Sequence, residues 1–117
     1  MKVDALEVNI HNPKIRDRIA KISKLLPLDD GTKLTAREVQ DEETLKSGRL
    51  SGYDLHVFEH DEPRITYAVF SFDTPIAWVI EDESGRPLRF ITNLPITTTT
   101  ERHRDVVRRA WLGKSGS

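Results

Sequence analysis

Residues 64–81 read RITYAVFSFDTPIAWVIE, and this stretch decides the fold. It is rich in β-branched and aromatic side chains, which suit the pleated, half-buried surface of a sheet. The sequence predicts two strands here, Arg64–Phe72 and Ile76–Glu81, joined by a turn at residues 73–75. Apolar side chains fall on both faces of the first strand, so we expect a central strand that is covered on both sides.

Two further strands are predicted on either side of this hairpin, at Tyr53–Glu59 and Leu88–Thr92. The connections contain Asp, Gly and Pro, which are residues that tight turns require. Short connections imply antiparallel neighbours. We therefore expect a four-stranded antiparallel meander.

Two helices are predicted to flank the meander. Residues 12–26 have Asn12 as a cap and isoleucines along one stripe. A C-terminal helix begins where Thr98 and Glu101 have the spacing of a capping box, and Gly113 ends it. An N-terminal and a C-terminal helix beside an antiparallel sheet give an α+β fold.

The remaining segments give weaker patterns. Residues 28–52 are predicted as a short helix or a loop, because Thr35 and Glu38 fit a capping box but few apolar residues follow them. Val3–Ile10 alternates in part and is predicted as a short strand.

Length and composition exclude several classes of protein. The chain has 117 residues, the usual size of one domain, so we expect a single α+β domain at residues 1–113 and a flexible tail at 114–117. With no cysteine, the chain has neither disulfides nor cysteine-based zinc sites. The longest apolar run, Ile76–Ile80, is far shorter than a membrane span. We expect a soluble, cytoplasmic protein.

Motifs for catalysis or cofactor binding are absent from the sequence. There is no Gly-x-Ser-x-Gly motif and no Gly-rich phosphate loop. His56 and His60 are the closest histidines, but four residues along a predicted strand separate them by about 13 Å. We therefore expect a non-enzymatic protein without a metal ion or cofactor.

Charge is segregated along the chain, although the net charge is only -1. Both ends are basic, whereas residues 29–62 are acidic overall. Within the acidic part, Asp41, Glu42 and Glu43 are predicted either as a solvated face or as a surface that binds a partner.

The final helix carries the residues of our sharpest hypothesis, a protein-binding surface. Trp111 and Leu112 would lie beside Arg104 and Arg108, and this combination is enriched at protein interfaces. Trp78, which lies in an apolar run, is instead predicted to be buried in the core.

A nucleic-acid interface is the alternative for the same helix. Phosphates would then contact Arg102, Arg104, Arg108 and Arg109. Glu101 and Asp105 partly neutralise these arginines along the helix. The sequence pI of about 6.4 also weighs against a dedicated nucleic-acid binder.

Residues 67–78 read YAVFSFDTPIAW, residues 97–103 read TTTTERH, and residues 107–110 read VRRA. Together they resemble a family of small uncharacterised proteins of bacteriophages that infect actinobacteria, which share a Ser-aromatic-Asx-Thr-Pro-Ile-Ala hairpin and a Thr-rich capped helix. Where the family usually has asparagine, this chain has Asp73. The resemblance implies a phage origin and action in the host bacterial cytoplasm, and it brings no catalytic residue.

We interpret the shared hairpin as scaffold. Asp73 is expected to accept amide protons within the turn, so Asp73→Ala should lower the free energy of unfolding by about 1 kcal/mol. Pro75 fixes the direction of the chain into the next strand.

The sequence as a whole favours a small non-enzymatic, phage-encoded protein that acts on a host or phage protein by surface contact. The oppositely charged regions also allow a homodimer. A nucleic-acid-binding regulator that uses the basic N- and C-terminal helices is the alternative, and no membrane association is expected.

Overall fold

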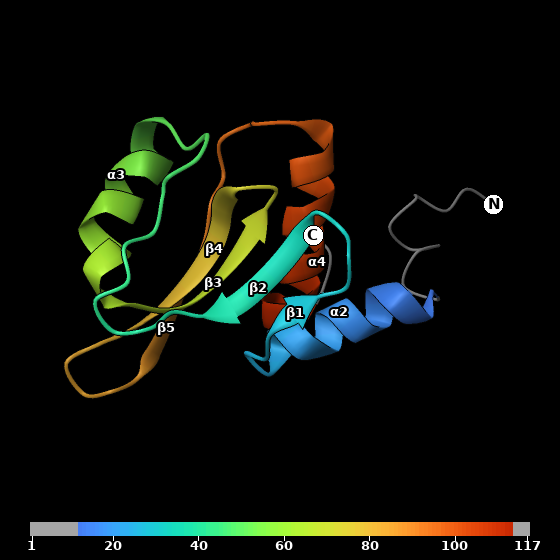
Figure 1. The fold of residues 1–117 in the computed structure, drawn as a ribbon, viewed down its shortest axis with the longest axis horizontal. Helices are drawn as coiled ribbons and strands as arrows, with labels where there is room; N and C mark the ends of the chain where they lie inside the picture. The colour runs from blue at the N-terminus through green and yellow to red at the C-terminus, as the bar shows by residue number, and fades with distance from the viewer. Residues whose placement is uncertain (1–11, 114–117) are drawn as a thin grey trace.

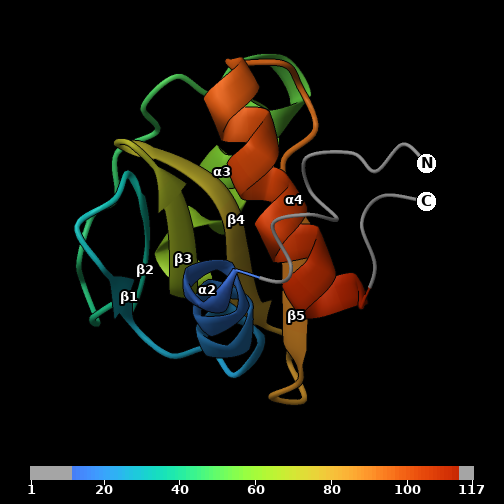
Figure 2. The same cartoon turned by 90° about the vertical axis from the view of Figure 1, so that its right-hand side faces the viewer.

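The computed structural model describes residues 12–113, which form a sheet with helices on both faces (Figure 1). The sheet is antiparallel and five-stranded, in the order β1-β2-β3-β4-β5. Helices α2 and α4 pack on one face and α3 packs on the other (Figures 1 and 2). The elements are α2 (Pro13–Ser23), β1 (Leu28–Asp29), β2 (Leu34–Glu38), α3 (Gly52–Asp61), the 3₁₀ helix η1 (Glu62–Arg64), β3 (Ile65–Ser71), β4 (Thr74–Glu81), β5 (Pro87–Ile91) and α4 (Thr98–Leu112). The predicted α+β fold is confirmed, with five strands rather than four.

The central strand β3 is covered on both faces, as its apolar pattern predicts. Tyr67 belongs to a core cluster that includes Ile22 of α2. Ala68, the next residue along β3, belongs to a second cluster that includes Phe58 of α3 and Trp78 of β4. Trp78 is fully buried, which confirms its predicted place in the core.

The segment Tyr53–Glu59, predicted as a strand, is part of helix α3, so that prediction is wrong. The buried face of α3 carries Asp54, Phe58 and Asp61. Because two of these three buried residues are acidic, the sequence lacks the helical spacing of apolar residues that would predict a helix. Asp54 accepts two backbone N–H groups from the chain after β5, and Asp61 accepts the Trp78 indole N–H at 3.0 Å. Long-range hydrogen bonds therefore satisfy these buried carboxylates.

Strand β2 lies where the sequence predicts a short helix or a loop. Thr35 and Glu38, predicted as a capping box, pair instead with Phe70 and Tyr67 of β3. Leu34 and Ala36 are buried, whereas the residue between them is partly exposed. This short alternation is the only local sign of a strand. Pairing with β3 decides the conformation of a segment whose own sequence is ambiguous.

The terminal helices begin close to the predicted positions. The Asn12 side chain accepts an amide proton of the first turn of α2, as predicted. In α4 the cap is Thr97 rather than Thr98, because Thr97 Oγ1 accepts the N–H of Thr100 at 3.0 Å. Glu101 binds arginines of its own helix. The predicted capping box is therefore shifted by one residue and lacks its carboxylate partner.

Two predictions lie outside the described residues, namely the strand at Val3–Ile10 and the tail at 114–117. Within residues 12–113, none of the helices combines the length and the apolar character that crossing a bilayer requires.

Candidate functional site

Arg104, predicted to lie on a binding surface, is completely buried. Its Nε donates to Thr92 Oγ1 at 2.9 Å, its Nη1 donates to Glu101 Oε2 at 3.0 Å, and its Nη2 donates to the carbonyl of Leu94. These bonds tie α4 to the chain that follows β5. Arg104 is thus a structural residue, and its assignment to an exposed protein or nucleic-acid interface needs correction.

The other arginines of α4 differ in how far they are already paired. Arg108 binds Glu101 at 3.0 Å and lies 3.8 Å from Asp105. Burial alone would raise the pKa of Glu101, but Arg108 and Arg104 outweigh it and hold that pKa below its ordinary value. Arg102 is exposed. The basic cluster therefore offers less free positive charge than the sequence suggests.

Trp111 and Leu112 lie where α4 ends, and Trp111 contacts α2 and β5. The Trp111 indole N–H donates to the Ile22 carbonyl at 3.0 Å, and the Arg89 guanidinium lies 5.7 Å from the centre of the indole ring. Leu112 remains 62% exposed. We call Arg89, Arg108, Trp111 and Leu112 the end surface. Sequence analysis missed Arg89 because it lies on β5, distant in sequence from α4.

The acidic residues predicted as a partner surface lie in the loop between β2 and α3. Asp41 and Glu42 are exposed. Glu43 binds Arg37, with 2.9 Å between Oε1 and Nη1, and the hydrogen bond from Arg37 lowers the pKa of Glu43. The loop thus has two exposed carboxylates, Asp41 and Glu42, directly before Glu43, which forms a surface ion pair with Arg37.

His56 and His60 are one helical turn apart in α3 rather than four residues apart on a strand. The separation of about 13 Å predicted from a strand is therefore wrong. Both side chains are exposed. Within residues 12–113, no group of three or more His, Asp or Glu side chains is arranged to hold a metal ion.

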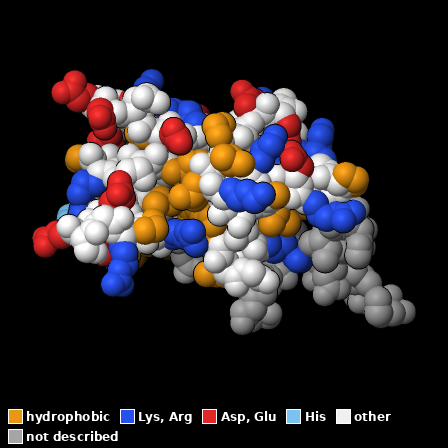
Figure 3. Space-filling view, turned by 90° about the horizontal axis from the view of Figure 1, so that it is seen from below, with side chains coloured by type: hydrophobic (Ala, Val, Ile, Leu, Met, Phe, Trp, Pro, Cys, Tyr) orange, Lys and Arg blue, Asp and Glu red, His pale blue; other side chains and the backbone are white. Residues whose placement is uncertain are grey.

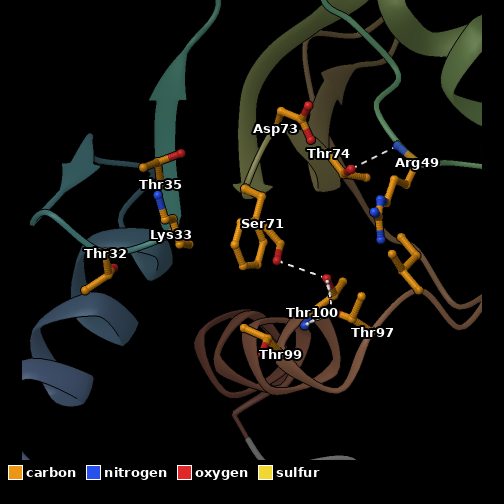
Figure 4. Close-up of a pocket in the computed structure, with 12 residues that line it drawn as sticks. Thr32, Lys33, Thr35, Arg49, Ser71, Asp73, Thr74, Thr97, Thr99 and Thr100 are labelled. Atoms are coloured by element: carbon orange, nitrogen blue, oxygen red, sulfur yellow. Dashed lines mark hydrogen bonds between the residues drawn. The ribbon is translucent and has the colours of Figure 1, made fainter.

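A hollow of about 780 Å³ opens where the β3–β4 turn meets the start of α4 (Figure 4). Its walls come from separate segments of the chain and are unusually rich in hydroxyl groups. The lining residues are Thr32, Lys33, Thr35, Arg49, Ser71, Phe72, Asp73, Thr74, Ile96, Thr97, Thr99 and Thr100. We call this the threonine pocket.

One wall of the threonine pocket depends on a close backbone contact. Gly48 has φ 57°, and a Cβ atom there would lie 2.4 Å from Thr74 Oγ1 and 2.7 Å from Thr74 Cα. The N–H of Arg49 donates to Thr74 Oγ1 at 2.9 Å. Only glycine fits this position, and its presence fixes the backbone of Arg49 beside the pocket.

The β3–β4 turn holds a bulky residue in a conformation that favours glycine. Phe72 has φ 58° and its side chain is 51% exposed. A left-handed conformation of this kind costs free energy for a bulky side chain. Asp73, its neighbour in the turn, makes no hydrogen bond in the described part of the chain, contrary to the role predicted for it.

A chain of hydroxyl groups forms the floor of the threonine pocket. Thr97 Oγ1 donates to Thr100 Oγ1 at 3.0 Å, and Thr100 Oγ1 lies 3.1 Å from Ser71 Oγ. Ser71 Oγ lies 2.7 Å from Nδ1 of His103. Burial, and to a lesser extent the charge of Arg18, lower the pKa of His103.

The Ser71–His103 pair has the spacing of a nucleophile and its base, but Ser71 is only 1% exposed. The exposed residues at the rim of the pocket would contact a ligand, whereas the Ser71 hydroxyl is almost inaccessible. The hydrogen bonds of this buried pair lie within the fold and hold the floor of the pocket in place.

The threonine pocket coincides with the two segments that carry the phage-protein resemblance, residues 67–78 and 97–103. Sequence analysis interpreted both as scaffold, because nothing local shows that the turn and the Thr-rich corner meet. The four consecutive threonines were the one available signal.

Comparison with known proteins gives no relative: no family model, no curated protein and no solved structure matches this chain.

Proposed function

We propose that this chain is a small, non-enzymatic, phage-encoded protein that binds a host or phage protein through the end surface. The phage origin and the host bacterial cytoplasm rest on the resemblance of residues 67–78 and 97–110 to proteins of actinobacteriophages.

The observation that carries the proposal is the exposure of Leu112 at the end of α4. Leu112 is 62% exposed and is next to Trp111, whose ring is covered by Arg89. Apolar and cationic side chains also alternate on the underside of the molecule, towards which α4 runs (Figures 2 and 3). Leucine, tryptophan and arginine together provide the apolar centre and the charged rim of a protein interface.

The end surface also indicates the chemistry of the partner. Arg89 makes no ion pair within residues 12–113, so a carboxylate of the partner can pair with it. Leu112 requires an apolar side chain opposite to it. The partner would thus present an apolar residue beside an acidic one. A second copy of the chain, presenting Asp41 and Glu42, is one such partner.

Affinity capture from lysate of an actinobacterial host, with and without infection, tests the proposal. Leu112→Glu should abolish capture of a protein that the wild type retains. Tyr53→Glu is a matched control, because Tyr53 is 68% exposed on α3, across the sheet from α4. A protein retained equally by all three chains would contradict a role for the end surface. Light scattering on the same variants distinguishes a homodimer from a foreign partner.

The nucleic-acid-binding regulator is the less favoured alternative. Arg104 is buried and Arg108 is bound to Glu101, which leaves Arg102, the half-buried Arg109 and two exposed lysines, Lys14 of α2 and Lys24 at its C-terminal cap, to contact phosphates. Retention on heparin that falls steeply with salt, and that Arg102→Glu weakens, would support this alternative.

A further inference from the structure

We propose that the threonine pocket binds a nucleoside monophosphate, with Lys33 and Arg49 on opposite walls providing the positive charge for its phosphate, and with the ring system against Phe72 (Figure 4). This inference goes beyond the proposed protein contact, because the pocket and the end surface share no residue.

The threonine pocket has the size and the composition of a small-molecule site. Its volume of about 780 Å³ lies within the usual range for ligand pockets, roughly 300 to 1,000 Å³. It collects residues from the β1–β2 turn, the chain before α3, the β3–β4 turn and the start of α4 (Figure 4). Such convergence of polar groups on one hollow is typical of binding sites.

The charge of the pocket favours an anionic ligand. Neither Lys33 nor Arg49 makes an ion pair within residues 12–113, although both line the pocket. Asp73 is the only acidic residue among the lining side chains, so the pocket has a net positive charge. A guanidinium offers paired N–H donors that match the oxygens of a phosphate group.

The position of Arg49 is built into the fold. Its backbone N–H is bound to Thr74 Oγ1 at 2.9 Å, and the preceding Gly48 allows the chain to approach Thr74 that closely. The guanidinium itself has no partner in the described residues. The structure thus fixes the base of a side chain whose charged end is free for a ligand.

The hydroxyl groups that remain free match the sugar of a nucleotide. Thr97, Thr100 and Ser71 are occupied by their mutual hydrogen bonds. The hydroxyls of Thr35 and Thr99 have no partner in residues 12–113 and can each donate and accept. Hydroxyls of this kind pair with the ribose hydroxyls of a ligand.

Phe72 supplies the surface for a ring. Its side chain lines the pocket, is 51% exposed, and is held at φ 58°, a conformation that glycine would adopt without strain. The Phe72 ring lies 6.4 Å, centre to centre, from the His103 ring, and the exposed part of the side chain is available to stack on a base.

Calorimetry on the full chain tests the inference with AMP, UMP, adenosine, ribose 5-phosphate, inorganic phosphate and a short single-stranded oligonucleotide. We expect AMP or UMP to bind at least about tenfold more tightly than adenosine, ribose 5-phosphate or phosphate alone. Arg49→Gln and Lys33→Gln should each weaken binding about tenfold, whereas Arg102→Gln, an exposed residue outside the pocket, should not.

Three substitutions of Phe72 separate the ring from the backbone strain. Phe72→Gly should raise the thermal midpoint by a few degrees and yet weaken nucleotide binding, because it removes both the strain and the ring. Phe72→Ala should weaken binding without this gain in stability, and Phe72→Tyr should preserve binding.

Several results would overturn the inference. They are the absence of mononucleotide binding to the folded chain, equal binding by Arg49→Gln, equal affinity for phosphate alone, and undiminished binding by Phe72→Ala. Binding of the oligonucleotide without binding of either mononucleotide would also overturn it and would favour a nucleic-acid interface. None of these results bears on the end surface.

Discussion

His103 and Ser71 are joined by a short hydrogen bond, with 2.7 Å between Nδ1 and Oγ. Burial lowers the pKa of His103, which favours the neutral ring, and in the tautomer with the proton on Nε2 its Nδ1 accepts the Ser71 proton. Ser71 then accepts from Thr100, which in turn accepts from Thr97. Every hydroxyl in this chain both donates and accepts, so the direction of all its protons is set at His103.

Ser71→Ala is expected to lower the free energy of unfolding by about 1 to 3 kcal/mol, because it leaves a buried donor and acceptor unpaired. Chemical denaturation measures the change. Thr99→Ala is the control, since Thr99 is exposed in the same corner and should change stability by less than about 0.5 kcal/mol. Equal effects of the two substitutions would show that the hydroxyl chain adds nothing.

Stability should depend on pH through His103. Its pKa in the fold is lowered, first by burial and then by Arg18, whereas in the unfolded chain it is about 6.5. The unfolded chain therefore binds more protons as pH falls through 6.5, and the stability that neutral His103 provides is lost below that value. Above it the contribution is complete.

The measurement for this prediction is the free energy of unfolding at pH 8, 6.5 and 5 for the wild type and His103→Gln. The difference between the two should shrink as the pH falls. A difference that stays constant or grows towards pH 5 would mean that His103 is protonated in the fold and donates to Ser71.

The parts of the fold that sequence predicts correctly are those in which local pattern and packing agree. The hairpin of β3 and β4 is apolar on both faces and is buried on both, and Asn12 caps α2 as its type predicts. Helix α3 escapes prediction because its buried face carries Asp54 and Asp61, whose partners are distant in the chain. Local periodicity cannot reveal such bonds.

The candidate sites also could not be predicted from the sequence, because their contacts join segments that are distant in the chain. Arg104 looks like a surface arginine until its bonds to Thr92 and Leu94 are seen. Arg49 looks unremarkable until Gly48 and Thr74 place it at a pocket. In each case the decisive contact joins segments that only the tertiary fold brings together.

Arg104→Met should lower the free energy of unfolding by about 3 kcal/mol, because it leaves Thr92 and the Leu94 carbonyl without their donor. Arg102→Met, two residues away and exposed, should have an effect below about 0.5 kcal/mol. Thermal or chemical unfolding of both variants measures the contrast. A stable Arg104→Met chain would show that the hydrogen bonds of Arg104 contribute little to the free energy of unfolding.

Asp73→Ala should change stability by less than about 0.5 kcal/mol, in contrast to the loss of about 1 kcal/mol expected from the sequence. The reason is that Asp73 is exposed and makes no hydrogen bond within residues 12–113. Chemical denaturation of the variant decides between the two values, and a loss near 1 kcal/mol would restore the predicted turn cap.

Gly48→Ala should be the most damaging of the glycine substitutions outside the helices. The new Cβ would meet Thr74 Cα at 2.7 Å, a backbone atom that cannot move without shifting β4, and φ is 57°. We expect a loss of about 2 kcal/mol or more, as strain and overpacking combine. Denaturant titration provides the value.

Gly85→Ala isolates the strain from the clash. Gly85 has φ 84°, but nothing lies within 4 Å of a Cβ there, so only the conformational cost of about 1 kcal/mol should appear. Because the Gly48 contact also positions Arg49, Gly48→Ala should weaken any ligand bound in the threonine pocket, whereas Gly85→Ala should not. Equal losses in the two variants would mean that the chain before α3 yields to accommodate the methyl group, and that the pocket wall is not fixed there.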